Sequence, residues 1–265
     1  MSNSKLDSQD LLSQYANSLQ GLQGNVHVLE QQVPVKRQIA YFKFSDKLRQ
    51  ELPPSSFPFS DEQVEKIYTD LLNEKQGDEY NVGKAEKRRL LAMLAISRSV
   101  KAFRCLQSYI EHPDPDIADW AAMALLECQL ALETELSDEK QIYIATAMGG
   151  RGQKLRFSLV FFAKWGTTFL PYQRQTIEEE IAFHFSQADC EIERLQIEDN
   201  YVKLLCLIPI KSDVQILFNK ILNGCNEVGD FLEHGFTISN VNELTEEEIL
   251  QEIAKNQHES NKAGN

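Results

Sequence analysis

The sequence has few of the residues that build metal or redox centres. It contains five cysteines, none in a C-x-x-C pair, and five histidines, none in an H-x-x-x-H spacing. Zinc sites and thioredoxin-like centres depend on such closely spaced pairs, so neither is indicated. A Gly-x-Ser-x-Gly motif is also absent, and with it the usual sign of a nucleophilic serine. We therefore predict no catalytic residue, no metal ligand and no cofactor.

Long apolar runs are lacking as well. No uninterrupted apolar stretch approaches the ~18 residues that cross a bilayer, and the first residues hold no apolar segment typical of a signal peptide. The cysteines sit mostly in apolar surroundings, as Cys206 does, which is typical of buried, reduced thiols. The sequence therefore predicts no membrane partner and a cytoplasmic location.

Positive charge is in short supply. The 265 residues include 27 Lys and Arg against 40 Asp and Glu, for a formal net charge of -13. An acidic chain is repelled by phosphate backbones, so nucleic acid is not expected as a partner. The length favours two domains, and the 42% of hydrophobic residues is ordinary for a globular protein.

Helical signals dominate the first half of the chain. Ser60-Asp61-Glu62-Gln63 matches a capping box, and apolar residues then recur at helical spacing over 64–72, 84–95 and 100–110. From His112 a proline-rich turn leads into an alanine-rich helix that is expected to run to about Leu132. These patterns predict stacked helix pairs over residues 1–136, with residues 1–24 loosely ordered.

The turn and the helix after it resemble HEAT-like repeats. Asp114-Pro115-Asp116-Ile117 followed by Ala121-Ala122-Met123-Ala124-Leu125 matches the repeat pattern, and the likeness extends over about Lys84 to Leu132. It departs from the pattern at Ala118 and Asp119, and Trp120 replaces a small residue. The resemblance implies a short helix stack that presents a protein-binding face.

After Ser137 the periodicity changes to that of strands. Two β-like runs, 142–147 and 155–163, flank a glycine-rich turn, and a helix from Pro171, strands at 190–197 and 201–210, a helix from Ser212, a strand at 235–238 and a helix capped by Thr245 follow. From Leu155 the order is the split βαβ pattern of ferredoxin-like domains, with the run at Ile142 as an extra strand. The predicted fold class is α+β: an N-terminal α-helical, HEAT-like domain (1–136), then a ferredoxin-like βαββαβ domain with an extra strand (137–255) and a disordered tail (256–265).

The strongest basic cluster in the sequence is Lys84, Lys87, Arg88 and Arg89. Such a cluster can contact an acidic partner or nucleic acid. Glu86 interrupts it, however, and any surface helix needs a solvated face, which is the simpler interpretation. We keep these four residues as the candidate partner-binding site.

A second candidate is the glycine turn, with Gly149, Gly150, Arg151 and Lys154. Glycines let backbone N–H groups converge on an anion, and the two cations would add charge. A phosphate-binding P-loop is followed by a helix, whereas a strand follows here, so a plain hairpin turn with exposed basic residues is favoured.

Taken together, these features favour a non-enzymatic interaction or scaffold protein with a protein partner. A regulatory protein that binds a small anion through the α+β domain is the second hypothesis. An enzyme of unknown reaction is the third. The sequence gives no indication of the oligomeric state.

Overall fold

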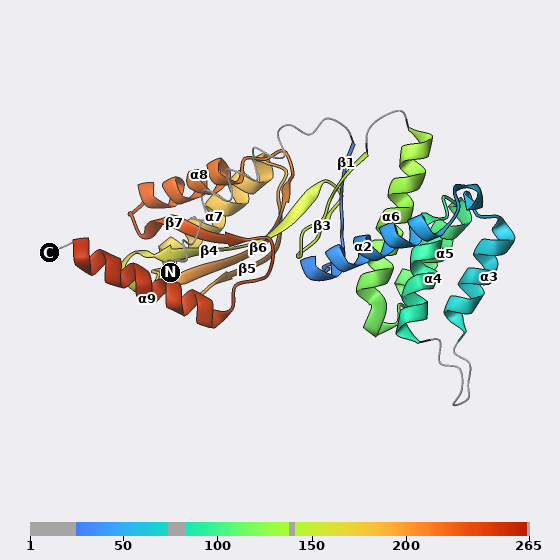
Figure 1. The fold of residues 1–265 in the computed structure, drawn as a ribbon. Helices are drawn as coiled ribbons and strands as arrows, with labels where there is room; N and C mark the ends of the chain where they lie inside the picture. The colour runs from blue at the N-terminus through green and yellow to red at the C-terminus, as the bar shows by residue number, and fades with distance from the viewer. Residues whose placement is uncertain (1–24, 74–82, 138–140, 264–265) are drawn as a thin grey trace. The chain divides into compact units, whose positions relative to one another are not determined.

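The computed structural model describes residues 25–73, 83–137 and 141–263. The chain divides into two compact units, with residues 23–146 in one and residues 147–265 in the other. Helices come first and the main sheet follows, so the predicted α+β class is confirmed (Figure 1). The loosely ordered segment expected over 1–24 lies outside the described residues. Within the described ranges, no helix is both long enough and apolar enough to cross a membrane.

The first unit, which we call the helical unit, is built from helices and one pair of strands. The helices are α2 (Val35–Glu51), α3 (Asp61–Leu72), α4 (Lys84–Ile96), α5 (Val100–Glu111) and α6 (Ala118–Leu136). The strands β1 (Asn25–Val28) and β2 (Gln141–Ile144) pair in parallel and in register from Asn25↔Gln141 to Val28↔Ile144 (Figure 1). They lie at the two ends of the unit's sequence.

Local sequence signals place the helix starts where they were expected. Ser60 Oγ accepts the N–H of Gln63, and the Gln63 side chain accepts the N–H of Ser60 at 2.8 Å, which completes the predicted capping box of α3. Ser99 caps α5 by accepting the N–H of Ala102. Ala121, Ala122 and Ala124 of α6 are buried, and α6 packs against α4; small side chains of this kind allow two helices to approach closely. The resemblance to HEAT-like repeats stays a prediction.

The strand run that begins at Ile142 was expected to join the C-terminal sheet, and this was wrong. Residues 141–144 pair instead with β1 of the helical unit, about 115 residues earlier in the chain. The place beside the first long strand is taken by β3 (Gly150–Arg151), which the turn at Gly152 folds back onto that strand. Period-two alternation reveals a strand, but it does not say which edge the strand will pair with.

The second unit, which we call the α+β unit, contains one antiparallel sheet. Its strands are β3, β4 (Lys154–Ala163), β5 (Glu191–Ile197), β6 (Tyr201–Pro209) and β7 (Leu232–Ser239). The order is β3-β4-β6-β5, and β7 also pairs with β4. The helices are α7 (Pro171–Gln187), α8 (Val214–Glu227) and α9 (Glu246–Ala263). From β4 the chain order is strand, helix, strand, strand, helix, strand, as the sequence predicts.

Strand β4 is buried on both of its faces. On one face, Phe161 contacts Phe218 of α8 with ring centroids 6.0 Å apart. On the other, Val160 and Phe162 form a cluster with Ile249 and Ile253 of α9. Neighbouring residues of a strand point to opposite faces, so helices on both sides explain why β4 reads as a continuous apolar run rather than an alternating one.

The predicted disordered tail, 256–265, is also corrected in part, because α9 continues to Ala263. The helix begins as expected: Thr245 and Glu248 exchange the hydrogen bonds of a capping box. Beyond Lys255 the composition is polar, but no glycine or proline interrupts it before Gly264. Polar residues reduce the apolar packing of a helix, but they do not end it. A helix is ended by residues such as glycine and proline, which disfavour its backbone geometry.

Candidate functional site

Two of the four predicted partner-binding cations hold the proline turn in place. Asp114 accepts the N–H of Asp116 and also binds Lys87, whose Nζ lies 3.0 Å from Asp114 Oδ2. Lys84 is ion-paired with Asp116. The Lys87 side chain is only 11% exposed, and its hydrogen bond lowers the pKa of Asp114. Lys84 and Lys87 therefore fasten α4 to the turn before α6.

The other two cations of the cluster lie toward α2. The guanidinium of Arg88 sits over the Trp120 ring, 5.2 Å from its centroid, while Trp120 Nε1 donates to the Arg88 carbonyl at 3.0 Å. Arg89 Nη1 lies 3.6 Å from a carboxylate oxygen of Glu51 at the end of α2. A cation stacked on an indole keeps its charge at the surface while its stem is packed.

Trp120 also contacts α2, so it lies between the two basic helices. Its ring centroid is 5.2 Å from that of Tyr41 and 5.5 Å from that of Phe44, both in edge-on geometry. Next to it in sequence, Asp119 lies 4.0 Å from Nε of Arg37 on α2. The buried indole is therefore contacted by a cation of α4 and by aromatic rings of α2, and Arg37 of α2 pairs with the residue beside it.

α2 turns a polar side toward the interior because α6 carries a buried carboxylate. Glu127 is 4% exposed and accepts hydrogen bonds from Tyr41 Oη at 2.6 Å and from Ser45 Oγ at 2.7 Å. Arg49 adds an ion pair to the same carboxylate. A buried charge is tolerated only when donors of this kind surround it. The inner face of α2 is thus selected by Glu127 as well as by apolar packing.

The outermost side of α2 carries a row of lysines. At 100° per residue, Lys36, Lys43 and Lys47 fall within about 40° of one another around the helix axis and span about 16 Å along it. All three are exposed. Lys47 is 3.9 Å from Glu51, whereas in the described part of the chain Lys36 and Lys43 form no ion pair. We call Lys36, Lys43 and Lys47 the lysine row.

Beside the lysine row α2 exposes three apolar side chains. Val35, Ile39 and Phe42 keep 44%, 50% and 40% of their surface accessible. They fall within about 60° of one another around the axis, and Ile39 is about 40° from Lys43. We call these three residues the apolar strip. Large apolar groups beside a line of cations are unusual for a purely solvated helix face.

Charge is therefore strongly segregated in this chain. α2 contains five basic and two acidic residues, and α4 contains four basic and one acidic. These two helices hold nine of the 27 Lys and Arg and three of the 40 Asp and Glu, which leaves 18 basic and 37 acidic residues elsewhere. Sequence reasoning missed α2 as part of the site because total charge hides this segregation.

The glycine turn that was the candidate anion site forms a tight hairpin between β3 and β4. Gly152 and Gln153 occupy its two central positions, and Gly152 has φ +59°, which suits a turn with glycine first. Gly149 also takes a positive φ, +66°, just before Gly150 enters β3. The structure thus gives the glycines a conformational role in turning the chain.

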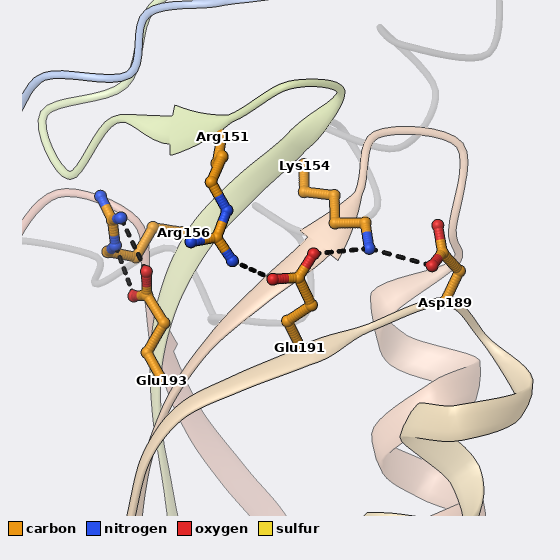
Figure 2. A network of polar contacts seen from close by, with 6 residues as sticks. All are labelled: Arg151, Lys154, Arg156, Asp189, Glu191 and Glu193. Carbon is orange, nitrogen blue, oxygen red and sulfur yellow. Dashed lines mark hydrogen bonds and ion pairs between the residues drawn. The ribbon is translucent and has the colours of Figure 1, made fainter.

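The cations of this hairpin are paired with carboxylates of the same unit (Figure 2). Arg151 is ion-paired with Glu191, and Lys154 Nζ lies 2.9 Å from Glu191 and 3.0 Å from Asp189. Arg156 binds Glu193 through two nitrogens, at 2.6 and 2.8 Å. The hydrogen bonds from Lys154 and Arg151 lower the pKa of Glu191. Three cations face three carboxylates, so the network is close to neutral.

The thiols do not form reactive centres. Burial raises the pKa of Cys128 and Cys225 to about 12 and that of Cys190 to about 11. These groups are therefore protonated at neutral pH, and a thiol reacts as a nucleophile only as its thiolate. Among the residues that the structure describes, no three His, Cys, Asp or Glu side chains are grouped so as to hold a metal ion.

Comparisons by sequence find no matching family model and no matching curated protein. Among the solved structures that match part of this chain are two transposases. A protein assigned as a transposase from Deinococcus radiodurans R1 matches 39% of this chain and 91% of its own, with 18% identity and a TM-score of 0.35. A REP-associated tyrosine transposase bound to a REP hairpin matches 44% of this chain and 68% of its own, with 11% identity and a TM-score of 0.31.

These matches contradict two of the sequence-based predictions. Both matched proteins are named as transposases, so the expectation of a scaffold or adaptor protein is corrected. One of them is bound to a REP hairpin, so the expectation of a protein partner and no nucleic acid is corrected. That expectation rested on net charge, which says nothing about where the cations lie.

Proposed function

We propose that this protein binds nucleic acid through a basic face of its helical unit. The face consists of the lysine row together with Arg37, Arg88 and Arg89, and we call it the basic face. The observation that carries the proposal is the charge segregation: α2 and α4 hold nine basic and three acidic residues in a chain of net charge -13. Phosphate contacts from clustered Lys and Arg supply most non-specific affinity for nucleic acid.

The spacing of the lysine row suits a phosphate backbone. Its three ammonium groups project from one side of α2 over about 16 Å. Successive phosphates of one B-form strand advance ~3.4 Å along the duplex axis, so the row passes about five of them. Long lysine stems adjust to the positions of the phosphates without movement of the helix.

The basic face is better suited to this task than the hairpin of Figure 2. At the hairpin, a phosphate must displace Glu191 or Glu193 and then lies beside the displaced carboxylate. On α2, Lys36 and Lys43 form no ion pair in the described residues, and Lys47 has a single partner at 3.9 Å. Exposed ion pairs are weak, but like charges next to a phosphate oppose binding directly.

The proposal is tested by charge reversal on the lysine row. Binding of fluorescein-labelled 20-nucleotide DNA, as single strand and as duplex, is measured by anisotropy at 50–200 mM salt. The K36E/K43E/K47E variant is expected to lose at least tenfold in affinity at 50 mM salt. The slope of log K against log salt is expected to flatten by about 2 to 3, since each phosphate contact contributes about 0.7–0.9 to it.

The matched control is K211E/K220E/K255E, which changes the same amount of charge on exposed lysines of the α+β unit. This variant is expected to bind within about threefold of the natural protein. Equal losses of affinity in the two variants would mean that the effect comes from net charge alone and not from the lysine row. If the natural protein binds DNA and K36E/K43E/K47E binds it equally well, the assignment of the basic face is overturned. Far-UV circular dichroism checks that each variant is folded.

A further inference from the structure

The apolar strip on α2 has no function in a site that contacts phosphates alone. Val35, Ile39 and Phe42 expose 40–50% of their surfaces on the side of α2 next to the lysine row. The interior side of the same helix is occupied by Gln38, Tyr41, Ser45 and Leu48. The strip is therefore not a core face left uncovered. It is a second surface, fixed beside the cations by the helix itself.

Phe42 is held in a defined orientation by its neighbour. Its ring contacts that of Tyr41 edge-on, with centroids 5.7 Å apart and an interplanar angle of 79°. Tyr41 is itself immobilised, because it is fully buried and donates a hydrogen bond to Glu127. An exposed aromatic ring that is oriented from below loses little conformational entropy when a flat group stacks on it.

The chemistry that combines phosphates with flat apolar groups at this spacing is that of a single-stranded nucleic acid. In a duplex the bases are paired and stacked inside, and only phosphates and groove edges meet a surface helix. In a single strand the backbone can follow a row of cations while its bases stack on aromatic side chains. Such stacking is worth about five- to 150-fold in affinity per base.

We propose that the ligand of the basic face is single-stranded nucleic acid, with one unpaired base stacked on Phe42 and the next against Ile39. This inference rests on the function proposed above, since it assigns the bases of a strand whose phosphates the lysine row binds. No base is read by hydrogen bonds in this arrangement, so the preference is for strandedness and not for sequence.

The experiment compares F42A, F42W and the natural protein on a 20-nucleotide DNA strand and on the duplex of the same sequence. F42A is expected to weaken single-strand binding at least fivefold, to leave duplex binding unchanged, and to keep the salt slope, because no phosphate contact is lost. F42W is expected to restore single-strand binding. A 2-aminopurine base in the strand should be quenched by the natural protein and F42W, and not by F42A.

F183A is the matched control, since Phe183 of α7 is exposed to 55% and lies in the other unit. The outcomes separate the two proposals. If K36E/K43E/K47E weakens binding and F42A does not, or if F42A weakens strand and duplex equally, base stacking is refuted while the basic face stands. If K36E/K43E/K47E has no effect, the function proposed above fails, whatever F42A does.

Discussion

Loss of the buried carboxylate of Glu127 is expected to be the most damaging single change in the helical unit. This group accepts hydrogen bonds from Tyr41 and Ser45 and an ion pair from Arg49, all of α2. In E127A the hydroxyls of Tyr41 and Ser45 stay buried with no acceptor in the place of the carboxylate. Arg49, which is about half exposed, returns to water at little cost.

The magnitude follows from these two hydroxyls. Leaving a buried donor unsatisfied costs about 1–3 kcal/mol, so E127A should lower the free energy of unfolding of the helical unit by about 4 kcal/mol. E127Q retains the volume and one carbonyl oxygen, and about 2 kcal/mol is expected. Y41F removes one donor and leaves the carboxylate its other partners, for a loss of about 1 kcal/mol. The free energy of unfolding is therefore expected to fall most in E127A, less in E127Q and least in Y41F.

The chain offers a clean assay for this unit. It contains two tryptophans, Trp120 in the helical unit and Trp165 in the α+β unit. In a W165F background, fluorescence therefore reports on the surroundings of Trp120 alone, between α2 and α4. Urea titrations of each variant in that background give the free energy of unfolding by linear extrapolation.

E135A provides the comparison, because Glu135 also lies on α6 but is exposed, and among the described residues its ion pair is with Arg98. Its loss is expected to cost less than about 1 kcal/mol. The reasoning is refuted if E127A costs no more than E135A, or if Y41F is more damaging than E127A. Either result would mean that α2 is held by apolar contacts, and that its polar inner face is incidental.

Three further expectations concern other parts of the fold. Lys87 keeps the pKa of folded Asp114 below its ordinary value of 3.8. The stability that Asp114 contributes is therefore complete above about pH 4 and is lost as the pH falls through the folded pKa. D114N should be less stable than the natural protein at pH 7, and the urea midpoints of the two proteins should converge as the pH drops below 4. G152A should cost about 1 kcal/mol in thermal or urea unfolding because of its positive φ, whereas G235A, where a methyl group also meets nothing within 4 Å, should cost less than half as much. Ellman's reagent should not react at neutral pH with the buried thiols of Cys128, Cys206 and Cys225 until the chain unfolds. Prompt reaction would contradict their assignment as protonated core groups.

Much of the fold could be predicted because its signals are local. The capping boxes at Ser60 and Thr245 each involve residues three apart, and the helices begin where they indicate. The α+β unit was recognised from the order of its elements for the same reason. The pairing of β2 could not be found this way, since its partner β1 is chosen by contacts far apart in the sequence.

The candidate site was only half visible in the sequence. Lys84, Lys87, Arg88 and Arg89 stand together and were noticed, yet two of them fasten a turn. The basic residues of α2 are spread along the helix among polar and apolar residues. Glu127 holds Ser45 in the interior, and Gln38 is buried there because its amide donates to the carbonyls of Val33 and Thr146. Apolar residues such as Phe42 are therefore left outside, although apolar periodicity assigns them to the core. One buried acid among 40 cannot be identified by composition.

The parallel pairing of β1 with β2 has a mechanical consequence. The chain enters β1 at Asn25 and leaves β2 at Ile144, which are opposite ends of the ladder when two strands run in the same direction. Tension on the flanking chain therefore slides the strands past each other and loads every bond of the ladder together, instead of peeling them apart one at a time. The helices between residues 28 and 141 lie within the loop that the paired strands close. Tension on the backbone therefore reaches α2 and its cations only after β1 and β2 have separated.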